Sequence, residues 1–302
     1  MNKKLLYPKV QVLLSTYNGS KYLEEQLTSL YSQNNIDLSV LIRDDGSCDN
    51  TKEILNKYAE KYKNFRIIEG DNVGFARSFW LLLQAASDAE YYAFCDQDDI
   101  WDNNKLYKSI VLMRSVERAA LSLPVLYTAN VRAVNDSMHV IKEKAFDFDG
   151  VLNLAESLER SVLPGCTFVF NKELLEIAKR YNGRLIAHDW MIYLIATIFG
   201  KVVYDPQTHM NYRIHKGNTI GISTPIKEFQ NKLKRQFDRK RVKRSEIAVD
   251  LLNTYGNKIE PSKYDLIKLF SESDNPKNFR RILKYKEFRN VNFIIMVILR
   301  RV

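Results

Sequence analysis

Asp96, Asp98 and Asp99 stand together directly after an apolar run, in the segment YYAFCDQDDIW. Carboxylates at the end of a buried strand need a counter-charge, because an ionised side chain is costly to remove from water unless it is paired or binds a metal. Oxygen ligands suit Mg²⁺ or Mn²⁺, which bind one or two carboxylates together with substrate phosphates, and such a cation stabilises a departing diphosphate. The alternative is a solvated turn whose aspartates cap the next segment.

Asp44 and Asp45 follow a second apolar run and precede Gly46-Ser47. By themselves they are also consistent with a turn and a helix N-cap. In a binding site, a carboxylate here could accept the imide N–H of a uracil or thymine base.

Asp189 heads the strongly apolar segment WMIYLIATIFG. Partial burial at such a position raises the pKa of a carboxyl group towards the range that is useful for a general base. The alternative is that Asp189 only caps the helix that follows, a position that aspartate favours.

The elements that would position these residues alternate along the first hundred residues. Apolar runs at 10–15, 38–42, 65–69 and 91–95 predict strands, and helical periodicity at 21–33, from residue 51, and at 76–86 predicts helices. This alternation predicts an α/β fold with a mostly parallel central sheet and helices on both faces. Because ligands bind past the carboxyl ends of such strands, the polar residues after strands one, two and four should meet on one rim.

The second half is less regular. Strands are expected at 123–134 and 165–171, and helices at 150–160, 172–181 and 188–200. Residues 201–215 predict either a strand pair or a strand plus a loop. Beyond Pro225 the chain is charged and helical in period.

The net charge of +10 is concentrated in the last quarter of the chain. Residues 227–244 hold nine Lys and Arg against two acidic residues, with apolar side chains recurring every three or four positions. This pattern predicts a basic amphipathic helix, which an anionic membrane surface attracts by about 1 kcal/mol per basic residue. Nucleic acid would attract it too. The third interpretation is a helix whose apolar edge packs on the preceding domain or on a second subunit.

Cys48, Cys95 and Cys166 form no C-x-x-C pair, which favours a reducing cytoplasm over a disulfide framework or a zinc site. No run approaches the roughly 18–20 apolar residues of a spanning helix, since the segment 291–302 is shorter and ends in arginines. We therefore expect a cytoplasmic protein, soluble or peripheral on the inner face of the cell membrane.

The ordered motifs VLLSTYNG, DDGSCDNT, NVGFARS, FCDQDDIW, GCTFVFN, HDWMIYLIA and YRIHKGN resemble family 2 glycosyltransferases of the GT-A (Rossmann-like) fold. The resemblance spans roughly residues 8–222, and the subgroup most similar is the bacterial rhamnosyltransferase-like one. It implies a catalytic domain over 1–225, with a nucleotide-binding half at about 1–120 and an acceptor half at about 121–225. The basic helical region would occupy 226–302.

The resemblance also implies roles for individual residues on the donor side. Ser15 and Tyr17 lie where the family's first loop contacts the nucleotide, and Asp45 matches its base-binding aspartate. Arg77 falls where a basic residue approaches the donor. Asp96 would bind the ribose side of the nucleotide.

At the reacting centre, Asp98 matches the metal-binding residue, and His215 a position that often joins the metal or the pyrophosphate. Asp189 matches the catalytic base, and Asp99 is expected to be structural, helping to cap the segment that follows. The chain departs from the usual pattern at His188, where the family usually has Glu, and at Cys48, where it usually has Thr.

Together these observations predict an inverting glycosyltransferase that uses Mg²⁺ or Mn²⁺. It would move a sugar, L-rhamnose on dTDP if the subgroup likeness holds, from a dTDP- or UDP-sugar to a saccharide or polyprenyl-linked acceptor in cell-surface polysaccharide synthesis. A homodimer and an anionic membrane surface are further partners that the tail allows, and no nucleic acid is expected. The alternatives are a catalytically silent assembly partner of the same fold and a nucleic-acid-binding protein acting through the basic tail.

Overall fold

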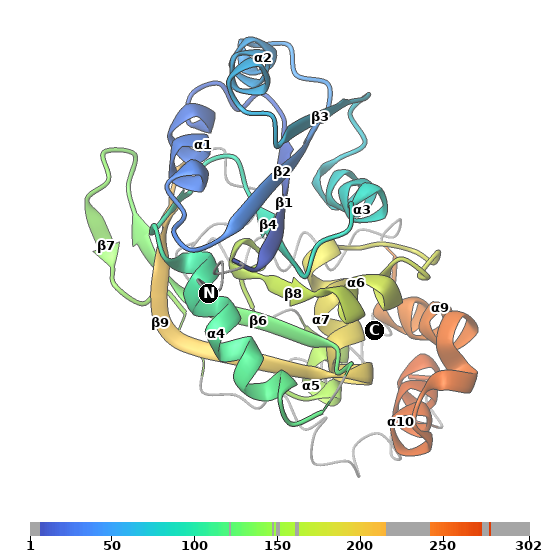
Figure 1. Ribbon diagram of the computed structural model, residues 1–302. Coiled ribbons are helices and arrows are strands. Elements are labelled where there is room, and N and C mark those ends of the chain that lie inside the picture. Colours follow the sequence, from blue (N-terminus) through green and yellow to red (C-terminus); the bar gives the residue numbers. More distant parts are fainter. Residues whose placement is uncertain are drawn as a thin grey trace.

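Figure 1 shows the computed structural model, which describes residues 7–120, 122–146, 148, 152–160, 163–215, 242–273 and 278. In chain order the elements are β1 (Lys9–Thr16), α1 (Leu23–Tyr31), β2 (Asp37–Asp44), α2 (Thr51–Lys61), β3 (Phe65–Glu69), α3 (Phe75–Ala85), β4 (Tyr91–Cys95), β5 (Ile100–Trp101), α4 (Lys105–Glu117), β6 (Val125–Val134), β7 (Val140–Lys142), α5 (Leu154–Glu159), η1 (Gly165–Thr167), β8 (Val169–Asn171), α6 (Lys172–Ala178), α7 (His188–Phe199), β9 (Lys201–Arg213), α9 (Arg244–Tyr255), η2 (Gly256–Lys258) and α10 (Pro261–Ser271).

One sheet runs through the described part of the molecule in the order β3-β2-β1-β4-β8-β6-β9-β5, with β7 paired to β6. The strands β3, β2, β1 and β4 are parallel to their neighbours, as the alternation of strands and helices predicts. Beyond β4 the sheet is mixed, because β8 is antiparallel to both β4 and β6 while β6 and β9 are parallel. The predicted α/β class is thus confirmed, but the parallel arrangement is limited to the first half of the chain.

Alternating side chains of the strands build a separate core on each face of the sheet. Val12 and Leu14 pack with α1, α2 and α4, whereas Leu13 between them packs with α3, α5, α6 and α7. Successive strand residues point to opposite faces, so each buried strand supplies both cores. The prediction of helices on both faces is confirmed.

Two segments of the second half differ from the expected elements. Residues 165–171 form a 3₁₀ turn followed by a three-residue strand, because Thr167 and Phe168 donate their N–H groups back to Pro164 and Gly165. The segment 201–213 is one long strand, β9, rather than a strand pair. Its register against β6 shifts between Asp205 and Thr208, where Pro206 can donate no ladder hydrogen bond.

The C-terminal helices α9 and α10 pack onto the same core as α5, α6 and α7 (Figure 1). Ile247, Leu251, Ile267 and Phe270 are buried in this contact. The predicted basic helix over 227–244 lies almost entirely outside the described residues, and the division at residue 225 stays a prediction. Among the helices that the structure describes, none is both long enough and apolar enough to span a membrane.

Gly200 joins α7 to β9 at a point of close backbone approach, and it generates a prediction about stability. A Cβ atom there would lie 1.9 Å from the carbonyl oxygen of Pro124, which is backbone and cannot rotate away. We expect Gly200→Ala to lower the free energy of unfolding by about 1–3 kcal/mol in urea denaturation. Gly256→Ala is the matched control, because its Cβ would meet only the Tyr264 ring at 3.4 Å. Equal losses in both variants would contradict this account.

Candidate active site

The carboxyl ends of the parallel strands bring the predicted polar segments together. Thr16 is in register with Asp44, and Leu14 with Cys95, so the loops after β1, β2 and β4 share one rim. Gln97 ties two of these loops: its Oε1 accepts hydrogen bonds from Thr16 Oγ1 (2.6 Å) and from the N–H of Tyr17 (2.9 Å). The convergence expected from the sequence is therefore present.

Asp98 and His215, the two predicted metal ligands, touch each other although 117 positions separate them in the sequence. His215 Nε2 lies 2.7 Å from Asp98 Oδ2, and both side chains are largely but not fully buried. Two adjacent ligands of an octahedral Mg²⁺, each about 2.1 Å from the ion, stand roughly 3 Å apart. The pair therefore fits a divalent cation with little movement, although its role as a ligand pair stays a prediction.

Asp96 and Asp99 add two further carboxyl groups that interact electrostatically with Asp98. One oxygen of each lies within 4.8 Å of the other and of the thiol sulfur of Cys166. Burial and the neighbouring carboxylates of Asp98 and Asp189 raise the pKa of Asp96 to about 7, and burial raises the pKa of Asp99 well above its usual value. This clustered negative charge favours binding of a cation.

Asp99 differs from the expectation that it caps the following segment. Its Oδ1 accepts the backbone N–H of Arg213 on β9 at 3.3 Å, and the N-cap position of α4 is Asn104. The Oδ2 atom of Asp99 is buried with no hydrogen-bond partner among the described residues. Asp99 is therefore structural, but not as a helix cap: its side chain joins the loop of residues 96–99, called the aspartate loop below, to the end of β9.

Lys105 is a buried cation beneath this cluster that the sequence analysis missed. Its side chain is almost fully buried, its Nζ donates to the carbonyl of Cys166 at 3.1 Å, and that atom lies 3.2 Å from the centroid of the Trp101 ring. Burial lowers the pKa of Lys105 to about 8. A signal was present, because Lys105 precedes Leu106, Ile110 and Met113 on the buried face of α4.

Asp189 lies in the first turn of α7, with its carboxylate partly buried. Its Oδ1 accepts the N–H of Trp190 at 2.7 Å, and burial raises the pKa of Asp189 to about 6. Gly165 makes room for this side chain, because a Cβ atom at residue 165 would lie 2.8 Å from Asp189 Oδ2. The charge of Asp189 contributes to the raised pKa of Asp96, so the predicted base lies close enough to Asp96 to interact with it electrostatically.

His188, which replaces the family's usual Glu, lies in an aromatic environment. Its ring stacks on Phe79 at 4.0 Å between centroids and meets the ring of Phe94 edge-on at 4.8 Å. Burial lowers the pKa of His188 to about 3, so its imidazole is uncharged at neutral pH. The acidic position usual in the family is thus occupied by a neutral side chain.

Besides Asp96, the four residues predicted to bind the donor differ in exposure. Ser15 Oγ shares a 2.6 Å hydrogen bond with Ser78 Oγ, and the Tyr17 side chain is 46% exposed at the rim. Asp45 is buried, where it forms an ion pair with Arg43 and accepts the N–H groups of residues 73 and 74 at 3.0 Å each. Arg77 is exposed on the first turn of α3. The structure therefore brings Ser15 and Asp45 together through Arg43 and Ser78, and it brings neither Tyr17 nor Arg77 into that network.

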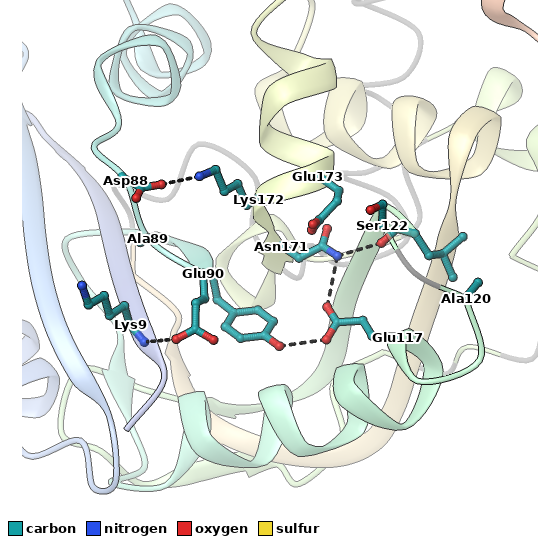
Figure 2. Close-up of a pocket in the computed structure, with 12 residues that line it drawn as sticks. Lys9, Asp88, Ala89, Glu90, Glu117, Ala120, Ser122, Asn171, Lys172 and Glu173 are labelled. Atoms are coloured by element: carbon teal, nitrogen blue, oxygen red, sulfur yellow. Dashed lines mark hydrogen bonds and ion pairs between the residues drawn. The ribbon is translucent and has the colours of Figure 1, made fainter. Parts of the chain in front are cut away.

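A cavity lies elsewhere, at the amino ends of β1 and β4 (Figure 2). It encloses about 540 Å³ and is lined by residues that include Lys9, Glu90, Glu117 and Asn171. None of the predicted site residues lines it. The predicted site at the carboxyl ends of the strands is therefore separate from this cavity.

Comparison with known proteins agrees with this geometry. The sequence profile of glycosyl transferase family 2 matches residues 11–177, which include most of β1, the aspartates that follow β4, and β8. The chain belongs to glycosyl transferase family 2. It is 28% identical to the dTDP-rhamnosyl transferase RfbG of Shigella flexneri over 229 residues, which cover 71% of this chain and 75% of that one. It is also 24% identical to the glycosyltransferase GlyA of Streptococcus pneumoniae, covering 73% of this chain and 32% of that protein.

Solved structures show the same fold at low sequence identity. TarS 1–349 of S. aureus, solved in complex with UDP-GlcNAc, superposes with a TM-score of 0.60 at 19% identity, covering 97% of this chain and 82% of that one. The mannosyltransferase PcManGT of Pyrobaculum calidifontis, in complex with GDP-Man and Mn²⁺, gives a TM-score of 0.54 at 16% identity and covers 97% and 79%. The protein is therefore a family 2 glycosyltransferase with the GT-A fold.

The raised pKa of Asp189 makes a prediction about stability. A carboxyl group that holds its proton more tightly when folded loses its stabilising contribution as the pH rises from about 4 through its folded pKa of about 6. Replacing it by Asn should therefore reduce the fall in unfolding free energy between pH 5 and pH 7.5. We expect a difference of about 1–2 kcal/mol, less than the ~3 kcal/mol that two pKa units represent, because Asp189 is partly solvated.

Urea denaturation of the wild type and of Asp189→Asn at both pH values measures this difference. Asp37→Asn, at an exposed position on β2, is the control and should follow the wild-type dependence. An unchanged pH dependence in Asp189→Asn would show that the carboxyl group is not desolvated as described.

Proposed function

We propose that this protein is an inverting, metal-dependent glycosyltransferase that uses Asp189 as its catalytic base and the Asp98–His215 pair to hold a divalent cation. The observation that carries this proposal is the contact of Asp98 with His215, next to Asp96, with which Asp189 interacts electrostatically. An acceptor hydroxyl and a donor diphosphate need a base and a cation on opposite sides of the anomeric carbon. Asp189 would be the base, and Asp98 and His215 would be ligands of the cation.

The proposed reaction is a single displacement. Asp189, ionised above its pKa of about 6, removes the proton from an acceptor hydroxyl, whose oxygen attacks the anomeric carbon as the bond to the diphosphate breaks. Mg²⁺ or Mn²⁺ on Asp98 and His215 would supply Lewis-acid stabilisation of the leaving diphosphate. Attack from the opposite face inverts the anomeric configuration.

The nucleotide would occupy the loops after β1 and β2. Tyr17 is exposed and able to stack on a base, and Asp45 is fixed by Arg43 beside it. Asp96, which the rim leaves partly exposed, would accept a hydrogen bond from the ribose. Ser15 and Arg77 are the remaining residues that we assign to the donor.

We further propose L-rhamnose on dTDP as the donor, because the rhamnosyltransferase from Shigella flexneri aligns with 71% of this chain. A saccharide or a polyprenyl-linked sugar would then be the acceptor, in cell-surface polysaccharide synthesis. The basic segment 227–244 would place the enzyme against an anionic membrane surface, where a lipid-linked acceptor is found.

Binding of the donor predicts a metal-dependent gain in stability. A ligand that binds only the folded state at 100 times its Kd raises the unfolding free energy by about 2.7 kcal/mol. We expect dTDP, UDP or their sugars to raise the Tm with Mn²⁺ present, and to lose most of this effect in Asp98→Asn. The measurement is a thermal-shift panel with and without Mn²⁺. Absence of a shift with every pyrimidine nucleotide would refute the donor assignment.

Loss of the base predicts loss of transfer without loss of donor binding. General-base catalysis contributes about 10²–10⁴-fold, so Asp189→Asn should reduce kcat by a factor in that range while the nucleotide-induced shift in Tm remains. Gly165→Ala should act in the same direction, because its Cβ would displace the Asp189 carboxylate. The rate of sugar transfer is measured with each variant, and exposed Asp37→Asn serves as the control. Full activity in Asp189→Asn would exclude it as the base.

A further inference from the structure

Arg213 ends β9 two residues before His215, and it is only 2% exposed. An ionised side chain is rarely buried to this degree unless hydrogen-bond partners compensate for its lost hydration. Arg213 matches none of the roles assigned above. Its partners therefore indicate what it does.

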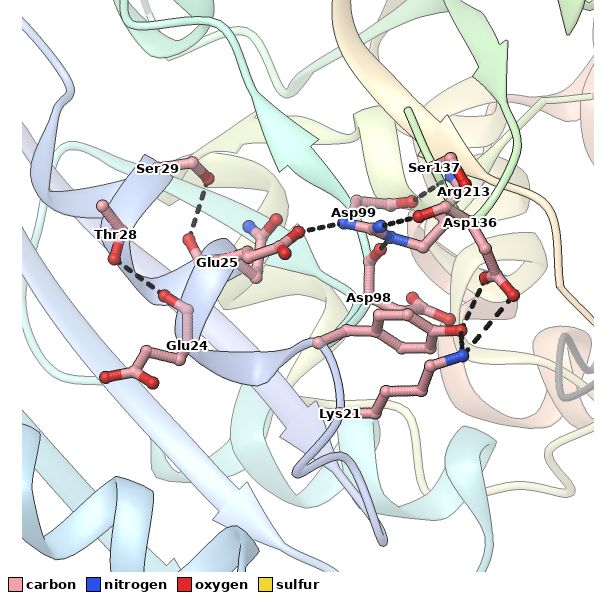
Figure 3. A network of polar contacts seen from close by, with 12 residues as sticks. Lys21, Glu24, Glu25, Thr28, Ser29, Asp98, Asp99, Asp136, Ser137 and Arg213 are labelled. Carbon is pink, nitrogen blue, oxygen red and sulfur yellow. Dashed lines mark hydrogen bonds and ion pairs between the residues drawn. The ribbon is translucent and has the colours of Figure 1, made fainter. Parts of the chain in front are cut away.

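The guanidinium of Arg213 binds three separate segments of the chain (Figure 3). Its Nε donates to the carbonyl oxygen of Asp98 at 3.0 Å, and one Nη donates to the carbonyl oxygen of Asp136 in the β6–β7 turn at 3.1 Å. The other Nη forms an ion pair with the carboxylate of Glu25 on α1. The planar group thus joins α1, the aspartate loop and the β6–β7 turn at one point.

Arg213 also contacts a neighbour of each proposed metal ligand, namely Asp99 next to Asp98 and Tyr22 next to His215. The backbone N–H of Arg213 binds Asp99 Oδ1, so the residues on either side of the Asp98–Asp99 peptide are held. Its guanidinium lies 4.7 Å from the centroid of the Tyr22 ring, and the same ring lies 4.8 Å from the ring of His215. Tyr22 is itself fixed, because its hydroxyl donates to Asp136 Oδ1 at 2.6 Å.

We propose that Arg213 is a positioning residue that holds Asp98 and His215 at ligand distance, so that the cation site exists before the cation arrives. The inference rests on the proposed function, because it assumes that this pair binds the metal. It adds that the affinity for the metal depends on a guanidinium that does not coordinate it. Glu25 on α1 forms an ion pair with that guanidinium and therefore helps to orient it.

The positioning role requires arginine at residue 213 and not merely a positive charge. The guanidinium is a rigid planar fork whose donors point in fixed directions, whereas a lysine ammonium is a flexible point charge. Lysine at residue 213 would keep the positive charge but could not bind the Asp98 carbonyl, the Asp136 carbonyl and Glu25 together. Loss of a partner that orients metal ligands usually weakens metal binding by 10–100-fold.

The test is the Kd of Mn²⁺, measured by electron paramagnetic resonance with UDP present, for the wild type and Arg213→Lys. We expect a Kd that is 10–100-fold higher in the variant. Arg132→Lys is the matched control, because Arg132 lies on the same sheet and binds Asn211, Asp102 and Glu143 rather than the aspartate loop. Its Kd for Mn²⁺ should equal that of the wild type.

A purely structural role for Arg213 predicts a different pattern. Such a role would lower the Tm of Arg213→Lys and leave its Kd for Mn²⁺ unchanged, and that result overturns the inference. Metal-free UDP affinity should be the same in wild type and variant, because the guanidinium is assigned to the metal pair alone; an equal loss of UDP affinity would also overturn it.

Glu25→Gln keeps the test informative if Arg213→Lys does not fold, since the Glu25 side chain is 55% exposed and tolerates substitution. We expect a several-fold higher Kd for Mn²⁺ in this variant, and an unchanged value counts against the inference. Failure of the proposed function looks different, because the wild type itself would then bind no Mn²⁺.

Discussion

The structure depends on how it accommodates several carboxylates at the end of one buried strand. Asp96, Asp98 and Asp99 follow β4, whose side chains are all buried; Asp99 is buried as well, and Asp96 and Asp98 are only partly exposed to water. Burial and mutual repulsion raise the pKa of Asp96 to about 7. Positive charge nearby stabilises the ionised forms of these carboxyl groups. The described residues supply part of it through Lys105 below the cluster and Arg213 beside it, and a divalent cation on the open side would supply the rest.

The acidic residues around this site have different roles. The Asp98–His215 pair is partly exposed and is proposed to bind the cation, whereas Asp99 is almost fully buried and accepts the backbone N–H of Arg213. The proposed base comes from another element, because Asp189 begins α7 and reaches the cluster where Gly165 leaves room. Separating base from metal ligands in this way allows an acceptor and a leaving group to approach one carbon from opposite sides. Both depend on the sheet, whose β6 and β9 strands carry His215 back to the end of β4.

Much of the first half of the fold could be predicted from the sequence, because strands and helices there follow from the local spacing of apolar residues. The bounds of β3 and β4 agree with their apolar runs, and the parallel pairing of β1, β2 and β4 accounts for the shared rim. Buried charge is different. Arg213 reads as an ordinary surface cation in sequence, since its burial depends on Tyr22 and Glu25 from a distant segment. Lys105 lies on the apolar face of α4, but the carbonyl of Cys166 that accepts its hydrogen bond comes from another part of the chain. The spacing of apolar residues could not predict that β9 is a single strand. Pro206 is accommodated by a shift in register, and this shift is visible only in the pairing of β9 with β6.

The central claim is that Asp98 and His215 bind one cation together, and the coordination sphere of bound Mn²⁺ tests it most directly. Electron spin echo modulation detects nitrogen bonded to Mn²⁺, and His215 is the histidine that the structure places against Asp98. The account predicts modulation from one imidazole nitrogen in the wild type with UDP present, and its disappearance in His215→Gln while Mn²⁺ remains detectable at higher concentration. A bound Mn²⁺ with no nitrogen modulation in the wild type, or with modulation that persists in His215→Gln, would contradict it.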